Sequence, residues 1–120
     1  MAGTIVADTL THSTAGSIAT NYVVNGSAKA WAFATSAAAL TGESFNISSG
    51  VDNGTGDYTL SFSNNITSGN SVFSGTCGNS TAQILSVASR TTSSYDAHTF
   101  NSSGTATDNT NMTLVHGDLA

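Results

Sequence analysis

Apolar and polar residues alternate in short runs along this chain, and Gly, Asn and Ser separate the runs. A period of two places apolar side chains on one face of a β-strand, whereas helical spacing is poor throughout. Only residues 28–40 carry enough alanine to suggest a helix, and Trp31 and Phe33 within that segment also fit a strand. The pattern therefore predicts an all-β protein.

The clearest pair of predicted strands covers residues 43–48 and 57–63, with a segment rich in Gly and Asn between them. Asn53-Gly54 in that segment is among the strongest short-range turn signals, because both residue types accept positive φ. We therefore predict an antiparallel hairpin centred on residues 52–57. The side chains expected to point from this hairpin into one apolar core are Phe45, Ile47, Leu60 and Phe62.

Seven further segments fit strands, and eight or nine strands at this spacing are typical of an antiparallel β-sandwich or a jelly-roll-like domain. Residues 84–87 form the most apolar stretch, so we expect their strand to lie centrally in a sheet. The chain contains no proline, a common guard of exposed sheet edges, so a neighbouring subunit is one way to protect them. The seven segments are 3–7, 20–25, 28–34, 71–77, 81–89, 95–100 and 111–116.

The length of 120 residues fits a single domain, and a chain this short builds only a modest core. We expect one β domain over residues 1–120, in which residues 1–25 are a candidate segment for attachment or for strand pairing between subunits. Residues 1–8 lack the basic and apolar regions of a signal peptide, and no stretch approaches a membrane span. We therefore expect synthesis in a cytoplasm.

Charged residues make up only 8% of the chain, and the net charge is -5 with Lys29 and Arg90 as the only basic residues. A basic patch cannot form, so nucleic-acid binding and membrane binding are disfavoured. Surfaces of hydroxyls and amides pack together without a large cost of charge desolvation, which favours self-association. Cys77 is the only cysteine, so no intrachain disulfide exists, and we expect it to be a small buried residue.

Three ordered motifs stand in the first half of the chain: AKAW at residues 28–31, SFNISS at 44–49 and DNGTGDYT at 52–59. Together they resemble a recurrent module of tailed-phage virion proteins, which are often tail-fibre or other structural proteins. The opening segment, residues 1–17, is also similar to that of short members of this family. The resemblance covers roughly residues 1–62 and departs from the family pattern between Phe33 and Glu43.

This resemblance implies a non-enzymatic structural protein of a bacteriophage virion, either a fibre, a tip or a capsid decoration subunit. It also implies a homotrimer, since phage fibres and many decoration proteins are threefold, with other virion proteins as partners and no cofactor. The alternative is a carbohydrate-recognition module that binds glycans of the host surface during host attachment. Exposed aromatic residues clustered on one loop face would favour glycan binding, whereas burial of all aromatic residues would favour a purely structural role.

Few residues are candidates for a site. Asp52 and Asp57 flank the predicted turn and could share a Ca²⁺ with backbone carbonyls, although hydrogen bonds that stabilise the turn are the simpler expectation. Lys29 lies in an apolar segment, so it could snorkel or pair with an acid of a neighbouring strand or subunit. For the aromatic residues we expect core or interface packing rather than stacking on sugars. The candidates for an interface or for glycan stacking are Tyr22, Lys29, Trp31 and Phe33.

No local pattern marks a catalytic site. Asp96 and His98 place a carboxylate near an imidazole, but no nucleophile elbow or oxyanion loop accompanies them. Glu43 is the only glutamate, so a glycosidase with paired carboxylates would need aspartates placed by chance. His12, His98 and His116 lack the spacing of metal ligands, although one of them could form a ring around a threefold axis. We therefore expect no enzymatic activity.

Overall fold

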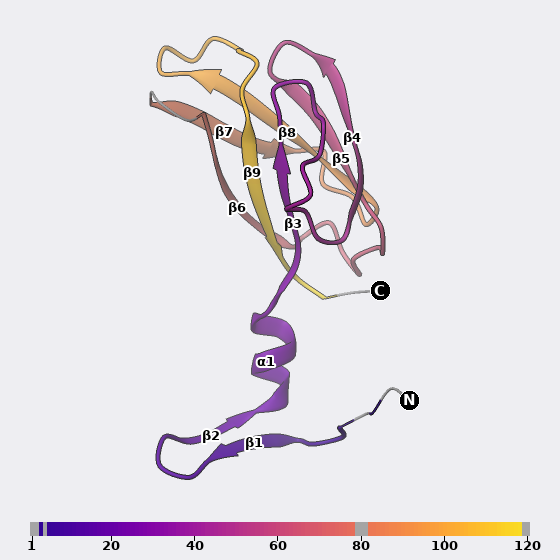
Figure 1. Cartoon of the computed structure of the whole chain (residues 1–120), viewed down its shortest axis with the longest axis vertical. Coiled ribbons are helices and arrows are strands. Elements are labelled where there is room, and N and C mark those ends of the chain that lie inside the picture. Colours follow the sequence, from indigo (N-terminus) through magenta and orange to yellow (C-terminus); the bar gives the residue numbers. More distant parts are fainter. Residues whose placement is uncertain (1–2, 4, 79–81, 119–120) are drawn as a thin grey trace.

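The computed structural model describes residues 3, 5–78 and 82–118. Two antiparallel sheets pack face to face as a β-sandwich, and a small hairpin and a short helix precede them (Figure 1). The predicted all-β sandwich is therefore confirmed. The elements in chain order are β1 (Thr9–His12), β2 (Gly16–Ala19), α1 (Thr20–Gly26), β3 (Ala28–Ala34), β4 (Ile47–Gly54), β5 (Asp57–Phe62), β6 (Val72–Cys77), β7 (Gln83–Ala88), β8 (Ser94–Asn101) and β9 (Asn111–His116).

The sandwich consists of a three-stranded sheet in the order β3-β9-β6 and a four-stranded sheet in the order β4-β5-β8-β7. All neighbouring strands are antiparallel. The hairpins β4–β5 and β7–β8 both belong to the four-stranded sheet, and the chain returns to the other sheet after each hairpin. Each crossing between the sheets joins the two layers, so neither sheet is a separate unit.

The core lies between the sheets because alternate residues of each strand point inward. Phe73 of the three-stranded sheet packs on Tyr95 of the other, with 4.9 Å between ring centroids. The Tyr95 hydroxyl also forms a hydrogen bond with the hydroxyl of Thr113 across the two layers, and burial raises the pKa of Tyr95 to about 12. The buried members of the core cluster are Ala30, Ala32, Ala34, Leu60, Phe62, Ile66, Tyr95, Ala97 and Val115.

Five of the seven further strand predictions are confirmed in position. These are the segments at 28–34, 71–77, 81–89, 95–100 and 111–116, which correspond to β3, β6, β7, β8 and β9. Within the segment at 81–89, residue 81 lies outside the described residues. Within the alanine-rich segment 28–40, residues 28–34 thus form a strand and not a helix.

The two strand predictions nearest the N-terminus are wrong. Residues 20–25 form helix α1, and the described residues of the segment 3–7 form no strand. The helical spacing places Thr20, Val23 and Val24 on one side of α1, where they lie beside Leu10 of β1. Residues 20–25 are therefore helical, with the two valines beside Leu10, although Thr, Tyr and Val favour strands.

The predicted hairpin exists as β4–β5 and its turn lies within the predicted segment 52–57, but its first strand covers Ile47–Gly54 rather than residues 43–48. The loop consists of Thr55 and Gly56, and Gly54 is the last residue of β4, next to a register shift. Gly56 has a φ of 69°, and a Cβ at this position would lie 2.4 Å from the carbonyl oxygen of Thr99. A contact with β8 therefore requires glycine at the turn, and Asn53 remains in the strand.

The predicted core side chains of this hairpin are confirmed except for one. Leu60 and Phe62 are buried in the core, and Ile47 packs against it while partly exposed. Phe45 instead precedes β4 and forms an isolated bridge with Trp31 at the edge of β3. This pairing places the Phe45 ring on the outside of the sandwich, which corrects the prediction that it points into the core.

The apolar stretch at residues 84–87 lies in β7, which is an edge strand and not a central one. Leu85 and Val87 pack against the core, whereas Ile84 faces outward. The central positions belong to β5 and β8, whose inward residues are buried while their outward residues are polar except for Phe100. Apolar character on both faces of a strand therefore did not identify the centre of the sheet.

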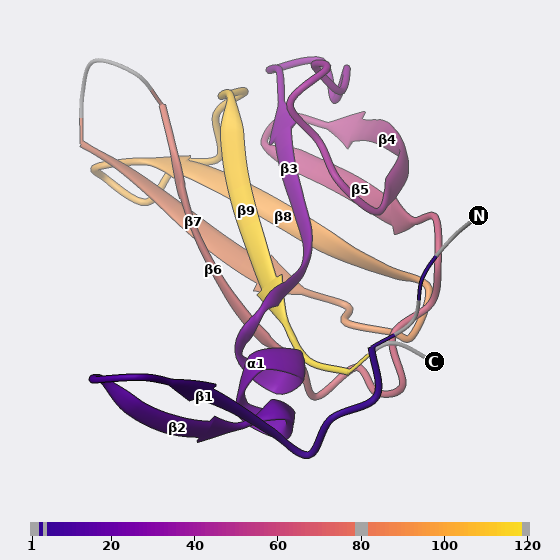
Figure 2. The ribbon, with the colours of Figure 1, turned by 60° about the horizontal axis from the view of Figure 1, so that its bottom comes forward.

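The segment of residues 5–27, which we call the arm, stands to one side of the sandwich in both views (Figures 1 and 2). None of its residues is buried. The radius of gyration of the chain is 16.9 Å, compared with about 14 Å for a compact domain of this length. The arm accounts for this elongation. The attachment role expected for residues 1–25 stays a prediction.

Candidate functional site

The two outer faces of the sandwich differ in chemistry. The outer face of the four-stranded sheet is largely polar, with Asp57, Thr59 and Ser61 on β5 and Asp96 and His98 on β8. The outer face of the three-stranded sheet is largely apolar, because the strand residues that alternate with buried ones there carry large hydrophobic side chains. These side chains are Trp31, Phe33, Val72, Met112 and Leu114, and the Phe45 ring joins them from the segment before β4.

Trp31 and Phe45 form a stacked pair of exposed rings on this apolar face, which we call the ring pair. Their centroids are 4.6 Å apart and their planes differ by 23°. The backbones of the two residues exchange two hydrogen bonds, with N···O distances of 2.9 and 3.1 Å, which fix the rings beside each other. The relative exposure is 41% for Trp31 and 48% for Phe45. The pair is therefore an exposed apolar surface whose two backbones are paired.

The structure places the sequence candidates for an interface in two groups. Trp31 and Phe33 lie on the same apolar face, two residues apart along β3. Tyr22 is exposed on α1 and belongs to the arm. Phe45 was missed as a surface residue, since its alternation with Ile47 assigned it to the core.

Lys29 does not snorkel, and it pairs with no acid among residues 3, 5–78 and 82–118. Its side chain is buried, and its ammonium group donates hydrogen bonds to the carbonyl oxygen of Val24 and to the hydroxyl of Ser27, at 2.8 Å in the second case. The carbonyl groups at a helix C-terminus carry partial negative charge, so a cation there is favourable. The hydrogen bonds of Lys29 therefore connect the last turn of α1 to the start of β3.

The arm contains a hollow of about 440 Å³ between its helix and its first residues, and this is the second apolar feature of the surface. Ile5 and Val6 at its rim are 89% and 92% exposed. A side chain of this kind gains free energy when it leaves water, at about 25 cal/mol per Å² of apolar area. The lining residues are Ile5, Val6, Ala7, Leu10, Thr20, Val23 and Val24.

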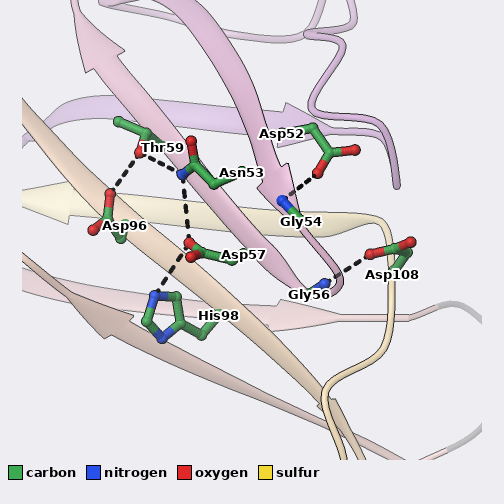
Figure 3. Close-up of polar contacts among 9 residues, drawn as sticks. All are labelled: Asp52, Asn53, Gly54, Gly56, Asp57, Thr59, Asp96, His98 and Asp108. Carbon is green, nitrogen blue, oxygen red and sulfur yellow. Dashed lines mark hydrogen bonds and ion pairs between the residues drawn. The ribbon is translucent and has the colours of Figure 1, made fainter.

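The polar residues around the β4–β5 turn form a hydrogen-bonded network on the four-stranded sheet (Figure 3). The Asn53 amide donates to the hydroxyl of Thr59 at 2.8 Å, and this hydroxyl donates to Asp96 at 2.7 Å. His98 Nε2 lies 3.3 Å from Asp57 Oδ1, so these two side chains form an ion pair when the imidazole is protonated. The network joins β4, β5 and β8 and stabilises the turn.

The two aspartates proposed for a shared Ca²⁺ are engaged separately. Asp52 accepts a hydrogen bond from the backbone N–H of Gly54 at 3.0 Å, whereas Asp57 faces His98 (Figure 3). The turn-stabilising hydrogen bond expected for Asp52 is thus present. Among residues 3, 5–78 and 82–118, no three His, Cys, Asp or Glu side chains are grouped so that they could hold a metal ion.

The predicted neighbours Asp96 and His98 lie on one face of β8 but have different partners. Asp57 and Ser86 are the residues in register with His98 on the two adjacent strands, so an aspartate, a histidine and a serine form a row. This row lies on an open sheet face, where His98 contacts Asp57 and Ser86 is exposed. Three hollows of the described surface are lined by other residues and do not include this row.

Of the remaining candidates, His116 lies on the outer face of the three-stranded sheet in register with Val72, whereas His12 and Cys77 lie elsewhere. His12 Nδ1 accepts hydrogen bonds from the backbone N–H groups of Thr14 and Ala15 and stabilises the β1–β2 turn. His116 ends β9, and Cys77 ends β6. Cys77 is buried, as predicted, and desolvation raises the pKa of its thiol, which lowers its reactivity.

Comparisons with protein-family models, with curated proteins and with solved structures found no match for this chain. No helix in the described part of the chain has the length and apolar character needed to span a bilayer.

Proposed function

We propose that this chain is a non-enzymatic structural subunit that self-assembles, as a trimer, in the virion of a tailed phage. The observation that carries the proposal is the apolar outer face of the three-stranded sheet, on which Trp31, Phe45 and Val72 are exposed. Exposed apolar patches of this kind in soluble proteins mark interaction sites. The place in a virion and the threefold symmetry rest on the sequence resemblance.

The exposed area of the chain supports self-assembly. The accessible surface is 7032 Å², whereas a compact monomer of 12.0 kDa exposes about 6,000 Å². The excess of about 1,000 Å² is comparable to the area that one partner contributes to a specific interface, about 800 Å². A subunit that buries this excess against other copies has the exposed surface of an ordinary compact protein.

Sheet edges give a second reason for a neighbour. Among the described residues, β6 in one sheet and β4 and β7 in the other have no strand on their outer side. Unpaired edge strands promote association, and the chain has no proline to block them. The edge of β3 differs, because bridges to Leu40 and Phe45 cover it.

One observation favours the alternative of a glycan-binding module. The ring pair is exposed, and aromatic rings of this kind stack on sugars. It lies on a sheet face, however, beside Phe33 and the Leu114 partner of Trp31, rather than among loops that offer polar groups for sugar hydroxyls. Its apolar surroundings suit a protein partner better.

Sedimentation at micromolar concentration tests the proposal. We expect the native chain to sediment as a trimer and Trp31→Ser to sediment as a smaller species. The matched control is Ile84→Ser, which removes an equally exposed side chain from the opposite outer face and should leave the trimer intact. A well-folded native monomer would refute self-assembly, and a dimer would refute the trimer alone.

Three further measurements address the rest of the proposal. Detection of the protein in purified phage particles tests its place in the virion, and its absence from them would refute that place. Binding of a glycan by a native monomer would establish the alternative function. Ester or polysaccharide hydrolysis that is lost in His98→Ala would refute the non-enzymatic role.

A further inference from the structure

We propose that the hollow of the arm in one copy receives the ring pair of a neighbouring copy. The inference rests on the proposed self-assembly and specifies which surfaces meet. The described chain presents an apolar hollow in the arm and an exposed pair of aromatic rings, Trp31 and Phe45. Both surfaces are exposed, and none of the residues that line the hollow belongs to the sandwich.

The arm is held away from the ring pair of its own chain. Lys29 bonds the carbonyl oxygen of Val24, and the N–H of Ser27 donates to the carbonyl oxygen of Val23 at 3.1 Å. These bonds hold the end of α1 against the start of β3, and α1 continues away from the sandwich in both views (Figures 1 and 2). The hollow lies between α1 and residues 5–7, and every residue that lines it belongs to the arm, so no part of the sandwich closes it.

Apolar character and the scarcity of charge together favour a second copy as the occupant. A ring pair that enters the hollow of another copy removes the apolar area of both surfaces from water. The contact also desolvates little charge, because Asp8 is the only Asp, Glu, Lys or Arg of the arm. Aromatic side chains that fill a desolvated pocket are the usual anchors of protein interfaces.

The contact joins different surfaces of two copies, so it is heterologous. Such a contact forms a closed ring when its rotation closes and an open filament when it does not. Every copy in a ring of three has its hollow filled and its ring pair covered. The proposed trimer therefore satisfies both apolar features of each chain.

Disulfide trapping between differently tagged copies tests this contact. One copy carries Val6→Cys at the rim of the hollow, and the other carries Glu43→Cys, two residues before Phe45. Both sites are exposed, so the substitutions should not disturb folding. Cys77 stays in place because it is buried. The control pair combines Val6→Cys with Ile84→Cys on the opposite outer face.

We expect mild oxidation of the mixed oligomer to link Val6→Cys to Glu43→Cys at least tenfold faster than the control pair. Predominant links between two Val6→Cys copies, with the oligomer intact, would overturn the inference and leave self-assembly standing. Equal rates of linking for the test and control pairs in an intact oligomer would also overturn the inference and leave self-assembly standing. A native monomer that forms no links would overturn both proposals.

Discussion

At the scale of single residues, Asn111 is the least satisfied side chain of the core. It is fully buried at the start of β9, and neither its amide nitrogen nor its amide oxygen has a hydrogen-bonding partner within the described residues. A buried polar group without a partner costs about 1–3 kcal/mol. The side chain therefore destabilises the fold, although its backbone pairs with both neighbouring strands.

We expect Asn111→Leu to raise the free energy of unfolding by about 1–2 kcal/mol, because leucine has a similar size and no polar atoms to satisfy. Urea denaturation of the purified chain measures the change. The matched control is Thr113→Val on the same strand, which removes a partner of Tyr95 and should lower the same free energy by about 1–3 kcal/mol. A loss in Asn111→Leu as large as that in the control would contradict the prediction.

Alternation in the sequence predicts which residues share a face, but not what covers that face. It correctly assigned Leu60 and Phe62 to the core. The same reasoning failed for Phe45, because its position depends on a bridge to Trp31, fourteen residues earlier in the chain. The role of Lys29 depends likewise on the last turn of α1, which contains Val24 and which the sequence pattern did not indicate.

At the scale of elements, the β4–β5 turn depends on a glycine with a tertiary contact. A Cβ on Gly56 would lie 2.4 Å from the carbonyl oxygen of Thr99 and 2.9 Å from the backbone nitrogen of Thr107. The Gly56 N–H also donates to Asp108 at 2.7 Å (Figure 3). The turn is thus held by the segment that connects β8 to β9.

We expect Gly56→Ala to lower the free energy of unfolding by at least about 2 kcal/mol, because its positive φ and its backbone neighbours both oppose a side chain. Thermal or urea unfolding measures the loss. Gly42→Ala serves as the control, since a Cβ there meets nothing within 4 Å, and its effect should stay within about 0.5 kcal/mol. Equal losses in both variants would contradict this explanation of the turn.

The elements that the sequence predicted best are those with regular alternation inside the sandwich. The β4–β5 turn forms within the predicted segment 52–57, but its loop is Thr55-Gly56 rather than Asn53-Gly54, the pair with the stronger local propensity, because Gly56 packs against Thr99. The arm was misread because it has no core face, so period-two alternation has no meaning there. Its helix brings Val23 and Val24 beside Leu10, a local contact that strand propensity does not anticipate.

At the scale of the whole molecule, assembly through apolar surfaces has a definite salt dependence. The proposed contact involves the ring pair and the hollow, and neither contains a charged side chain. We expect the dissociation constant of the oligomer to change by less than about threefold between about 0.05 M and about 0.5 M NaCl. Sedimentation equilibrium measures it. A much steeper weakening with salt would point instead to the face that carries Asp57 and His98.

The sequence predicted the sandwich but not the arrangement of its strands. Residues 84–87 have apolar side chains on both faces of β7, and this was interpreted as double burial in the centre of a sheet. Ile84 instead points outward and is exposed on the edge strand β7, where it lies opposite Phe100 of β8. Strand order depends on which strands pair across long loops, and hydrophobicity along one strand contains no such information.

Trp31 is the only tryptophan of the chain, and it lies in the ring pair. Its indole therefore supplies almost all of the fluorescence excited at the red edge of protein absorption, and the emission maximum of an indole depends on its contact with water. An indole that is 41% exposed in the single chain emits at longer wavelength than one enclosed by the arm of a neighbour. The native protein thus contains its own optical probe of the proposed contact, which reports on assembly without any label.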